Sequence, residues 1–253
     1  SQRASANWSR GLRVGSASLN TRVGLVTDRT GDSTTLVWIA HQADGNVLRF
    51  ARLDNAGRVV AEGPLAIDVG IPSQVELTLD AQGVAHVAYT ARVDHVYQLW
   101  YASFDAQGGM LSQPVLLSLP DVRVVGFAMC TAATGESDLM WVSEAEQGGV
   151  LYQVRVDAAG GVLDANVPLR NDVTEANARC DRNGGLHVAW MEEPADGELG
   201  VYYATLDRHT RELVQPNRVV SLPGVTGLVR RGPEIGLGGD YVYLIWSLER
   251  RGG

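Results

Sequence analysis

Two glutamates and an asparagine occupy corresponding positions in separate β-rich segments of the chain. Glu76, Asn177 and Glu234 stand 13, 13 and 12 residues before an aromatic residue that recurs along the sequence. A pair of carboxylates flanking a sugar can act as the acid and the base of a glycoside hydrolase, and their separation predicts retention or inversion. The other interpretation, which we favour, is that Glu76 and Glu234 are solvated residues at the starts of their strands, near a channel mouth.

Further charged residues are expected on the same face of the fold. Arg92 and Asp94 lie in one polar loop. Arg123 begins the next segment, and Arg231 lies in the longest loop between segments. Such groups could bind a sugar, a cation or a basic peptide, although exposed charge also keeps a domain soluble. We predict no cofactor and no metal site, because no Asp or Asn series has calcium-loop spacing. The predicted ligand-binding residues are Glu76, Arg92, Asp94, Arg123, Asn177, Arg231 and Glu234.

A repeat of about fifty residues positions these side chains. The recurring aromatic follows at intervals of 51, 52, 49 and 56 residues, and an Asp follows the first four aromatics after 16, 16, 16 and 17 residues. Three of these Asp residues begin an Asp-x-x-Gly turn, in which Asp caps its own turn and Gly supplies a positive φ. The spacing predicts one structural unit repeated along the chain. The aromatic residues are Trp38, Tyr89, Trp141, Trp190 and Trp246.

Each unit is predicted to contain four short strands. In the second unit the segments 75–79, 84–90, 96–104 and 110–118 are rich in β-branched and aromatic residues and are separated by turn residues. No stretch has sustained helical periodicity, so the fold class is all-β. Four-stranded units that recur in this way are typical of a β-propeller, in which each sheet packs against its neighbours. The recurring aromatic is then expected to fill the core between blades.

The repeat predicts a single propeller domain over residues 1–253, with five blades. The last blade takes strands from both termini, because few residues follow Trp246 and the N-terminal stretch contains two short β segments joined by a turn at Arg10 and Gly11. The alternative is a natural chain that continues beyond Gly253 into a larger propeller. The approximate blade ranges are 22–68, 72–120, 123–170, 175–222, and 232–253 together with 1–20.

The unit resembles the repeats of sialidase-like propellers of the BNR type. The resemblance rests on segments 80–83 (DAQG) with 86–89 (HVAY), and 181–184 (DRNG) with 187–190 (HVAW). It implies the fold. The Asp-box of sialidases is absent, and their arginine triad and Tyr/Glu pair cannot be mapped onto this chain. Five-bladed glycosidases of this kind place acids on three consecutive blades, whereas the third blade here offers Phe127 at the matching position.

Composition limits the possible partners. The chain has a net charge of −8, and all 21 of its basic residues are arginine. An acidic domain without a basic stripe is a poor candidate for binding nucleic acid. No run approaches the roughly 18 apolar residues of a membrane span. We therefore predict no nucleic-acid partner and no membrane insertion. The chain begins at Ser1 without Met, as expected if a leader or an upstream segment has been removed. We expect an extracellular, periplasmic or cell-surface location.

The cysteines and two histidines are assigned structural roles. Cys130 and Cys180 appear at equivalent positions on the first strands of blades three and four. A disulfide requires Cα atoms within about 7 Å, but we favour two buried thiols, since free Cys is among the most buried residue types. His86 and His187 occupy matching positions in blades that are not neighbours, so a shared metal ion is not expected.

These observations predict a non-catalytic binding or interaction propeller that recognises a glycan or a protein through its loop face. The alternative is a glycoside hydrolase or related carbohydrate-active enzyme that uses Glu76 and Glu234. A third possibility is a structural spacer in a larger surface protein. The carboxylates discriminate between the first two, because a shared pocket favours the enzyme and a packed interior excludes it.

Overall fold

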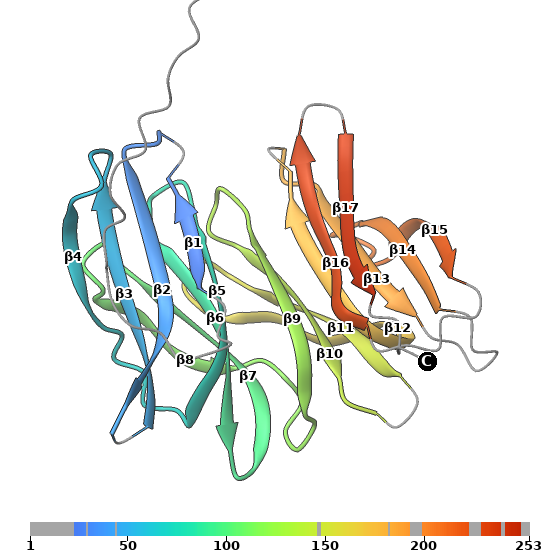
Figure 1. Ribbon diagram of the computed structural model, residues 1–253, viewed down its shortest axis with the longest axis horizontal. Coiled ribbons are helices and arrows are strands. Elements are labelled where there is room, and N and C mark those ends of the chain that lie inside the picture. Colours follow the sequence, from blue (N-terminus) through green and yellow to red (C-terminus); the bar gives the residue numbers. More distant parts are fainter. Residues whose placement is uncertain are drawn as a thin grey trace, which may run out of the picture.

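The computed structural model describes residues 23–28, 30–43, 45–145, 148–181, 183–192, 199–222, 229–238 and 241–248. Within these ranges the chain forms β-strands and no helix, so no helix there could span a membrane. Figure 1 shows the sheets following one another in chain order, with β1, β5, β9 and β16 toward the middle of the molecule. The predicted all-β fold class is confirmed.

The first two sheets are four-stranded antiparallel meanders, as the repeat predicts. Their strands pair in chain order, so the first strand of each unit is an edge and the fourth is the opposite edge. The first sheet contains β1 (Gly24–Thr27), β2 (Ser33–Gln42), β3 (Gly45–Asp54) and β4 (Val59–Pro64). The second contains β5 (Ile71–Leu79), β6 (Ala85–Val93), β7 (Val96–Phe104) and β8 (Met110–Leu116).

The third and fourth units join into one seven-stranded sheet. The 19-residue strand β12 (Val162–Cys180) pairs with β11 through its first half and with β13 through its second half. It is therefore the outer strand of one unit and the inner strand of the next. The other strands are β9 (Val124–Thr131), β10 (Ser137–Ser143), β11 (Gly149–Val156), β13 (Leu186–Glu192), β14 (Leu199–Leu206) and β15 (Leu213–Leu222).

The last sheet has two strands in the described part of the chain. They are β16 (Val229–Gly238) and β17 (Tyr241–Leu248), which pair with each other in antiparallel register. The two strands predicted within residues 1–20 lie outside the described residues. The outward side chains of β17 are exposed, with Tyr241 at 71% and Ile245 at 70%.

Three of the recurring aromatics lie in the core between neighbouring units. Tyr89, Trp141 and Trp190 are completely buried in clusters that combine residues of two units, which confirms their predicted packing role. Trp38 is 5% exposed and clusters with described residues of the first sheet. Trp246 is half-buried and packs against the cluster of Met191, Leu199 and Val201. The Asp turns also form as predicted: Asp105 Oδ1 accepts hydrogen bonds from the backbone N–H of Gln107 and Gly109, at 2.8 and 2.7 Å.

Inner strands of neighbouring sheets approach closely through one set of positions. A Cβ atom added to Gly24 would lie 2.8 Å from Leu77 Cβ and 3.1 Å from Leu77 N. At the next interface Glu76 Oε2 accepts a hydrogen bond from Met129 N at 2.7 Å. Within their own sheets, Gly24 and Glu76 pair with the residue one before the recurring aromatic, whereas Leu77 and Met129, which they face, pair with the residue two before it. The facing residues are therefore offset by one register position. The spacing between the first and second sheets leaves no room for a side chain at residue 24.

We expect the substitution Gly24→Ala to lower the free energy of unfolding by about 1–3 kcal/mol, because the new methyl group must displace backbone as well as side chain. Chemical denaturation measures this change. The matched control is Gly126→Ala on the inner strand β9, where an added Cβ meets no atom within 4 Å. Equal effects of the two substitutions would contradict the close approach at Gly24.

Candidate functional site

The two predicted carboxylates line one cavity at the inner strands. Glu76 from β5 and Glu234 from β16 border a space of about 350 Å³, together with Thr78, Met129 and Arg179. Residues 23–25, at the start of β1, form another part of the wall. Four sheets therefore contribute to this space, which we call the axial cavity. Both glutamates are half-buried and lie in the middle of their strands rather than at the strand starts that the sequence predicted.

Hydrogen bonds from neighbouring sheets hold both carboxylates in place. Asn177 Nδ2 donates to Glu234 Oε2 at 2.9 Å, across the interface between β12 and β16. Glu76 is held by the backbone N–H of Met129 in the same way. Asn177 is 6% exposed, and its Oδ1 atom has no hydrogen-bond partner in the described part of the protein. The carboxylates are thus oriented by the packing of the blades rather than by loops.

The strand pairing corrects one position of the predicted ring. Glu76, Asn177 and Glu234 pair with the residue immediately before the recurring aromatic of the second strand. In the third unit the residue with this pairing is Ala128, because Phe127 pairs with Trp141 itself. The predicted Phe127 is therefore wrong by one residue. A shift of one residue along a strand moves a side chain to the opposite face of the sheet.

Arg179 was missed by the sequence reasoning. It lies two residues beyond Asn177 on β12, so its side chain is on the same side of the strand. Thr78 has the same relation to Glu76 on β5. Alternation along the strand could have identified both residues once Glu76 and Asn177 had been selected. Arg179 brings a positive charge to a cavity that otherwise carries two carboxylates.

Arg92, Asp94 and Arg123 are not among the described residues that line the axial cavity. Arg92 is exposed at the end of β6, and Asp94 has a φ of 46° in the turn that follows. Arg123 forms an ion pair with Glu144 at 3.0 Å, and its guanidinium lies 5.3 Å from the ring centre of Tyr97. These groups gather where the second and third sheets meet. Of Arg231 only the backbone is described, as part of β16.

The two cysteines form a disulfide between inner strands. Cys130 on β9 and Cys180 on β12 are bonded, with their Cα atoms 5.5 Å apart. The preference for two free thiols is therefore wrong. So is the assumption of equivalent positions, since Cys130 pairs with Asp138 but Cys180 pairs with Leu186, one register position further along. The same offset of one register position separates Gly24 from Leu77 and Glu76 from Met129, the inner-strand residues that face each other at the first two interfaces.

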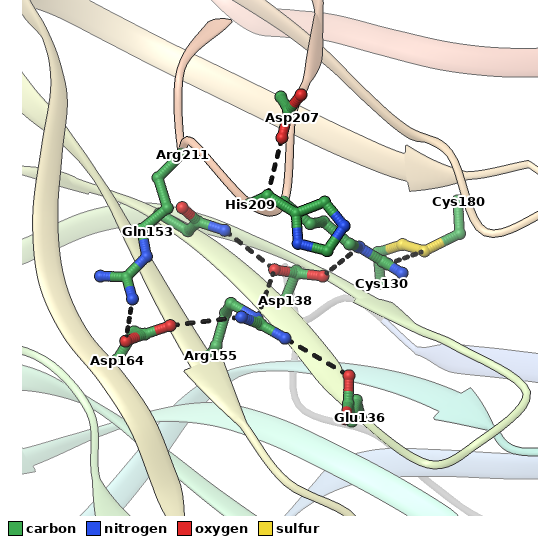
Figure 2. A network of polar contacts seen from close by, with 11 residues as sticks. Cys130, Glu136, Asp138, Gln153, Arg155, Asp164, Cys180, Asp207, His209 and Arg211 are labelled. Carbon is green, nitrogen blue, oxygen red and sulfur yellow. Dashed lines mark hydrogen bonds and ion pairs between the residues drawn. A yellow bond between two sulfur atoms is a disulfide. The ribbon is translucent and has the colours of Figure 1, made fainter.

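A polar network lies beside the disulfide, where the third and fourth units meet (Figure 2). The buried Asp138 pairs with Arg208 at 2.9 Å and accepts a hydrogen bond from Gln153 at 2.9 Å. Arg208 also donates to Cys180 Sγ at 3.5 Å. Burial raises the pKa of Asp138, and the Arg208 guanidinium is the largest opposing influence. Arg155 joins Asp138 to Glu136 and Asp164, and Arg211 pairs with Asp164.

His86 and His187 each join an Asp and a Tyr. His86 Nδ1 lies 2.5 Å from the Tyr101 hydroxyl, and its Nε2 lies 3.4 Å from Asp80 Oδ2. Burial lowers the pKa of His86, and Asp80 opposes the shift. His187 repeats both contacts in the fourth unit. The structural role predicted for the two histidines is confirmed by these contacts. Among the described residues, no group of three or more His, Cys, Asp and Glu is arranged to hold a metal ion.

Comparison with known proteins defines the fold class. No family model and no curated protein sequence matches the chain. A protein of unknown function from Dyadobacter fermentans has a TM-score of 0.56 at 11% identity, over 78% of this chain and 63% of that one. A polysaccharide lyase has a TM-score of 0.53 at 12% identity, over 90% of this chain and 54% of its own. A Hadza microbial sialidase has a TM-score of 0.50 at 14% identity, with coverages of 72% and 43%.

The chain thus spans between 43% and 63% of the length of these three structures. At such low identities the similarity shows the fold alone. The resemblance to sialidase-like propellers is confirmed at that level.

We expect reduction of the disulfide to destabilise the protein. The bond closes a loop with a sequence separation of 50 residues, for which the chain-entropy model gives about 4 kcal/mol. Dithiothreitol should therefore lower the melting temperature of the wild type. The double variant Cys130→Ala/Cys180→Ala should melt lower and should not respond to the reductant. A reductant response that persists in the double variant would contradict this origin.

We expect acidification to destabilise the protein through His86. The unfolded chain binds a proton near the ordinary histidine pKa of about 6.5, whereas buried His86 binds it only at lower pH. The free energy of unfolding should therefore decrease as the pH falls from about 7 through 6.5. His86→Gln should remove this part of the pH dependence in denaturant titrations, whereas His41→Gln, at an exposed residue, should retain it. Equal slopes for wild type and His86→Gln would contradict the assignment.

Proposed function

We propose that this chain is a glycan-binding propeller whose ligand enters the axial cavity. The observation that carries the proposal is that Glu76, Arg179 and Glu234, from three different units, line one space of about 350 Å³. Carboxylates and a guanidinium make charge-assisted hydrogen bonds, so together they can accept from and donate to the hydroxyl groups of a sugar. The volume is at the lower end of the roughly 300–1,000 Å³ typical of ligand sites, which favours a short saccharide over a folded protein partner.

A glycoside hydrolase is the second candidate, and the shared cavity is the specific observation that favours it. In that reaction one of Glu76 and Glu234 donates a proton to the leaving glycosidic oxygen. The other carboxylate then attacks the anomeric carbon or deprotonates a water molecule, according to the separation of the pair. Arg179 would bind the substrate. Two of the similar structures are named a polysaccharide lyase and a sialidase, which are enzymes that act on carbohydrates.

We also propose that the propeller has five blades over residues 1–253, with a last blade that combines β16 and β17 with strands from residues 1–20. The exposed apolar side chains on β17 support this closure. The protein is proposed to act outside the cytoplasm, because disulfides such as Cys130–Cys180 form and persist in oxidising compartments. A role as a spacer, or as a binder of proteins through the loops around Arg92, Asp94, Arg123 and Arg231, is the outcome expected if no glycan binds.

The test is a glycan array probed with the wild-type chain and scored for both binding and product release. We expect binding of a short saccharide. Glu76→Gln, Glu234→Gln and Arg179→Gln should each weaken that binding by about tenfold or more, because each loses a charge-assisted hydrogen bond worth about 1.5–3 kcal/mol. Glu62→Gln on the outer strand β4 is the matched control and should bind like the wild type.

Product release separates the two candidates. A hydrolase would release reducing sugar, and Glu76→Gln and Glu234→Gln would reduce that rate much more than they reduce binding. A binding protein would release none from any glycan. Absence of binding to the array, or binding that the three cavity variants leave unchanged, would overturn the proposal.

A further inference from the structure

The repeat places an aromatic ring of one unit against the next unit's turn. The ring of Phe50 on β3 covers Gly108, in the turn between β7 and β8, so closely that a Cβ atom there would lie 2.1 Å from it. Tyr101 on β7 occupies the same position in the second unit, and a Cβ atom added to Gly160 of the next turn would lie 3.7 Å from its ring. The glycine turn of each following blade therefore covers the third-strand aromatic of the preceding blade.

The first histidine chain is sealed from solvent, with the turn at Gly160 beside Tyr101 and the turn at Gly135 beside Asp80. The side chains of His86 and Asp80 are 0% and 5% exposed, and Tyr101 is fully buried. The equivalent chain in the fourth unit has the same contacts but a different environment. Its His187 and Asp181 side chains are 13% and 33% exposed. The two chains also differ in what stands over the tyrosine.

Tyr203, the counterpart of Tyr101, opens onto a cavity of about 390 Å³. The remaining wall is apolar and comes from both sides of the interface between the fourth unit and the last sheet. This space corresponds to the place that the glycine turn occupies at the first two interfaces. Its other lining residues are Val219, Val242, Leu244 and Trp246.

The interface between the third and fourth units shows what happens where the pattern is absent. Gln153 stands at the position of the aromatic, and it donates to the buried Asp138. The following turn carries Thr210 where the other turns have Gly. A polar residue at the position of the aromatic is thus matched with a turn that lacks the glycine, whereas the aromatic residues Phe50 and Tyr101 are matched with glycine turns.

We propose that residues 1–20 of this chain dock on β17 and that the turn at Arg10 and Gly11 occupies the cavity over Tyr203. This inference rests on the proposed five-bladed closure and specifies its contact. Six residues join β4 to β5 and seven join β8 to β9. A fourth strand ending near Ser18 would leave five residues before β1 at Gly24, which is a comparable link. Gly11 would then stand at the position of Gly108 and Gly160.

The experiment has two parts, of which the first tests the closure. A chain lacking residues 1–20 is compared with the full chain by thermal denaturation and by hydrogen exchange of the β17 amides. Closure predicts a lower melting temperature and faster exchange at the β17 edge that does not pair with β16. An unchanged melting temperature and exchange would overturn both the closure and the turn assignment.

The second part tests the turn by disulfide trapping in the full chain. The pair Gly11→Cys/Tyr203→Cys should form an intramolecular disulfide under mild oxidation, detected by loss of two titratable thiols. Phe50→Cys/Gly108→Cys is the positive control, since the structure places these residues in contact. Gly15→Cys/Tyr203→Cys is the negative control from the same segment.

The outcomes are distinguishable. Trapping in the Gly11 pair but not in the Gly15 pair supports the proposal. A destabilised deletion without trapping would retain the closure and overturn the placement of the turn over Tyr203. The exchange data test the closure even if a cysteine variant folds poorly. A disulfide-linked dimer of the Gly11 pair would show that a second copy occupies the cavity, which would overturn the proposal. Neither result depends on glycan binding.

Discussion

The contact between inner strands of neighbouring sheets is the constraint on which the rest of the structure depends. A sheet in this fold has no other way to bury its faces than to pack on the next sheet. At the first two interfaces an inner-strand residue faces the neighbouring strand one register position further along: Gly24 lies against Leu77, and Glu76 bonds to Met129 N. At the last described interface the facing residues Asn177 and Glu234 occupy the same register position and bond to each other. The offset of one register position also brings the hydroxyls of Thr78 and Thr131 to 2.5 Å, and it joins the two cysteines. The polar groups of the axial cavity are therefore part of the scaffold.

The repeat, the buried aromatics and the Asp turns could be predicted because each follows from local chemistry and spacing. An Asp that caps its own backbone needs only the residues beside it, as the two hydrogen bonds to Asp105 illustrate. The site was harder, because side-chain direction depends on strand register. Counting residues back to the aromatic gave Phe127, whereas the pairing gives Ala128. Arg179 was missed although it lies two residues beyond the selected Asn177, because alternation along β12 was not applied to it.

The interface between the third and fourth units departs from the pattern through several matched changes. Gln153 stands in place of an aromatic, and the turn that faces it carries arginines. The buried Asp138 accepts a hydrogen bond from Gln153 and forms an ion pair with Arg208. A buried charge without partners would cost several kcal/mol, so removing any one of these groups leaves the others unpaired. Sequence reasoning could not anticipate the network, because Asp138, Gln153 and Arg208 are distant in the chain and each is unremarkable alone. The uninterrupted strand β12 and the disulfide fix the same interface covalently.

The Asp–His–Tyr chains illustrate how a repeat separates structure from function. Taken alone, an aspartate, a histidine and a hydroxyl in hydrogen-bond contact resemble a catalytic relay. Here the arrangement occurs twice with nearly equal distances, and in the second unit it is sealed from solvent. A group that recurs wherever the blade plan recurs is explained by the plan. The inner-strand residue that pairs with the residue before the recurring aromatic differs from unit to unit. It is Gly24, Glu76, Ala128, Asn177 and Glu234 in chain order. This position varies while the blade plan recurs, and two of its residues, Glu76 and Glu234, line the axial cavity, which is why the proposed ligand site is placed there.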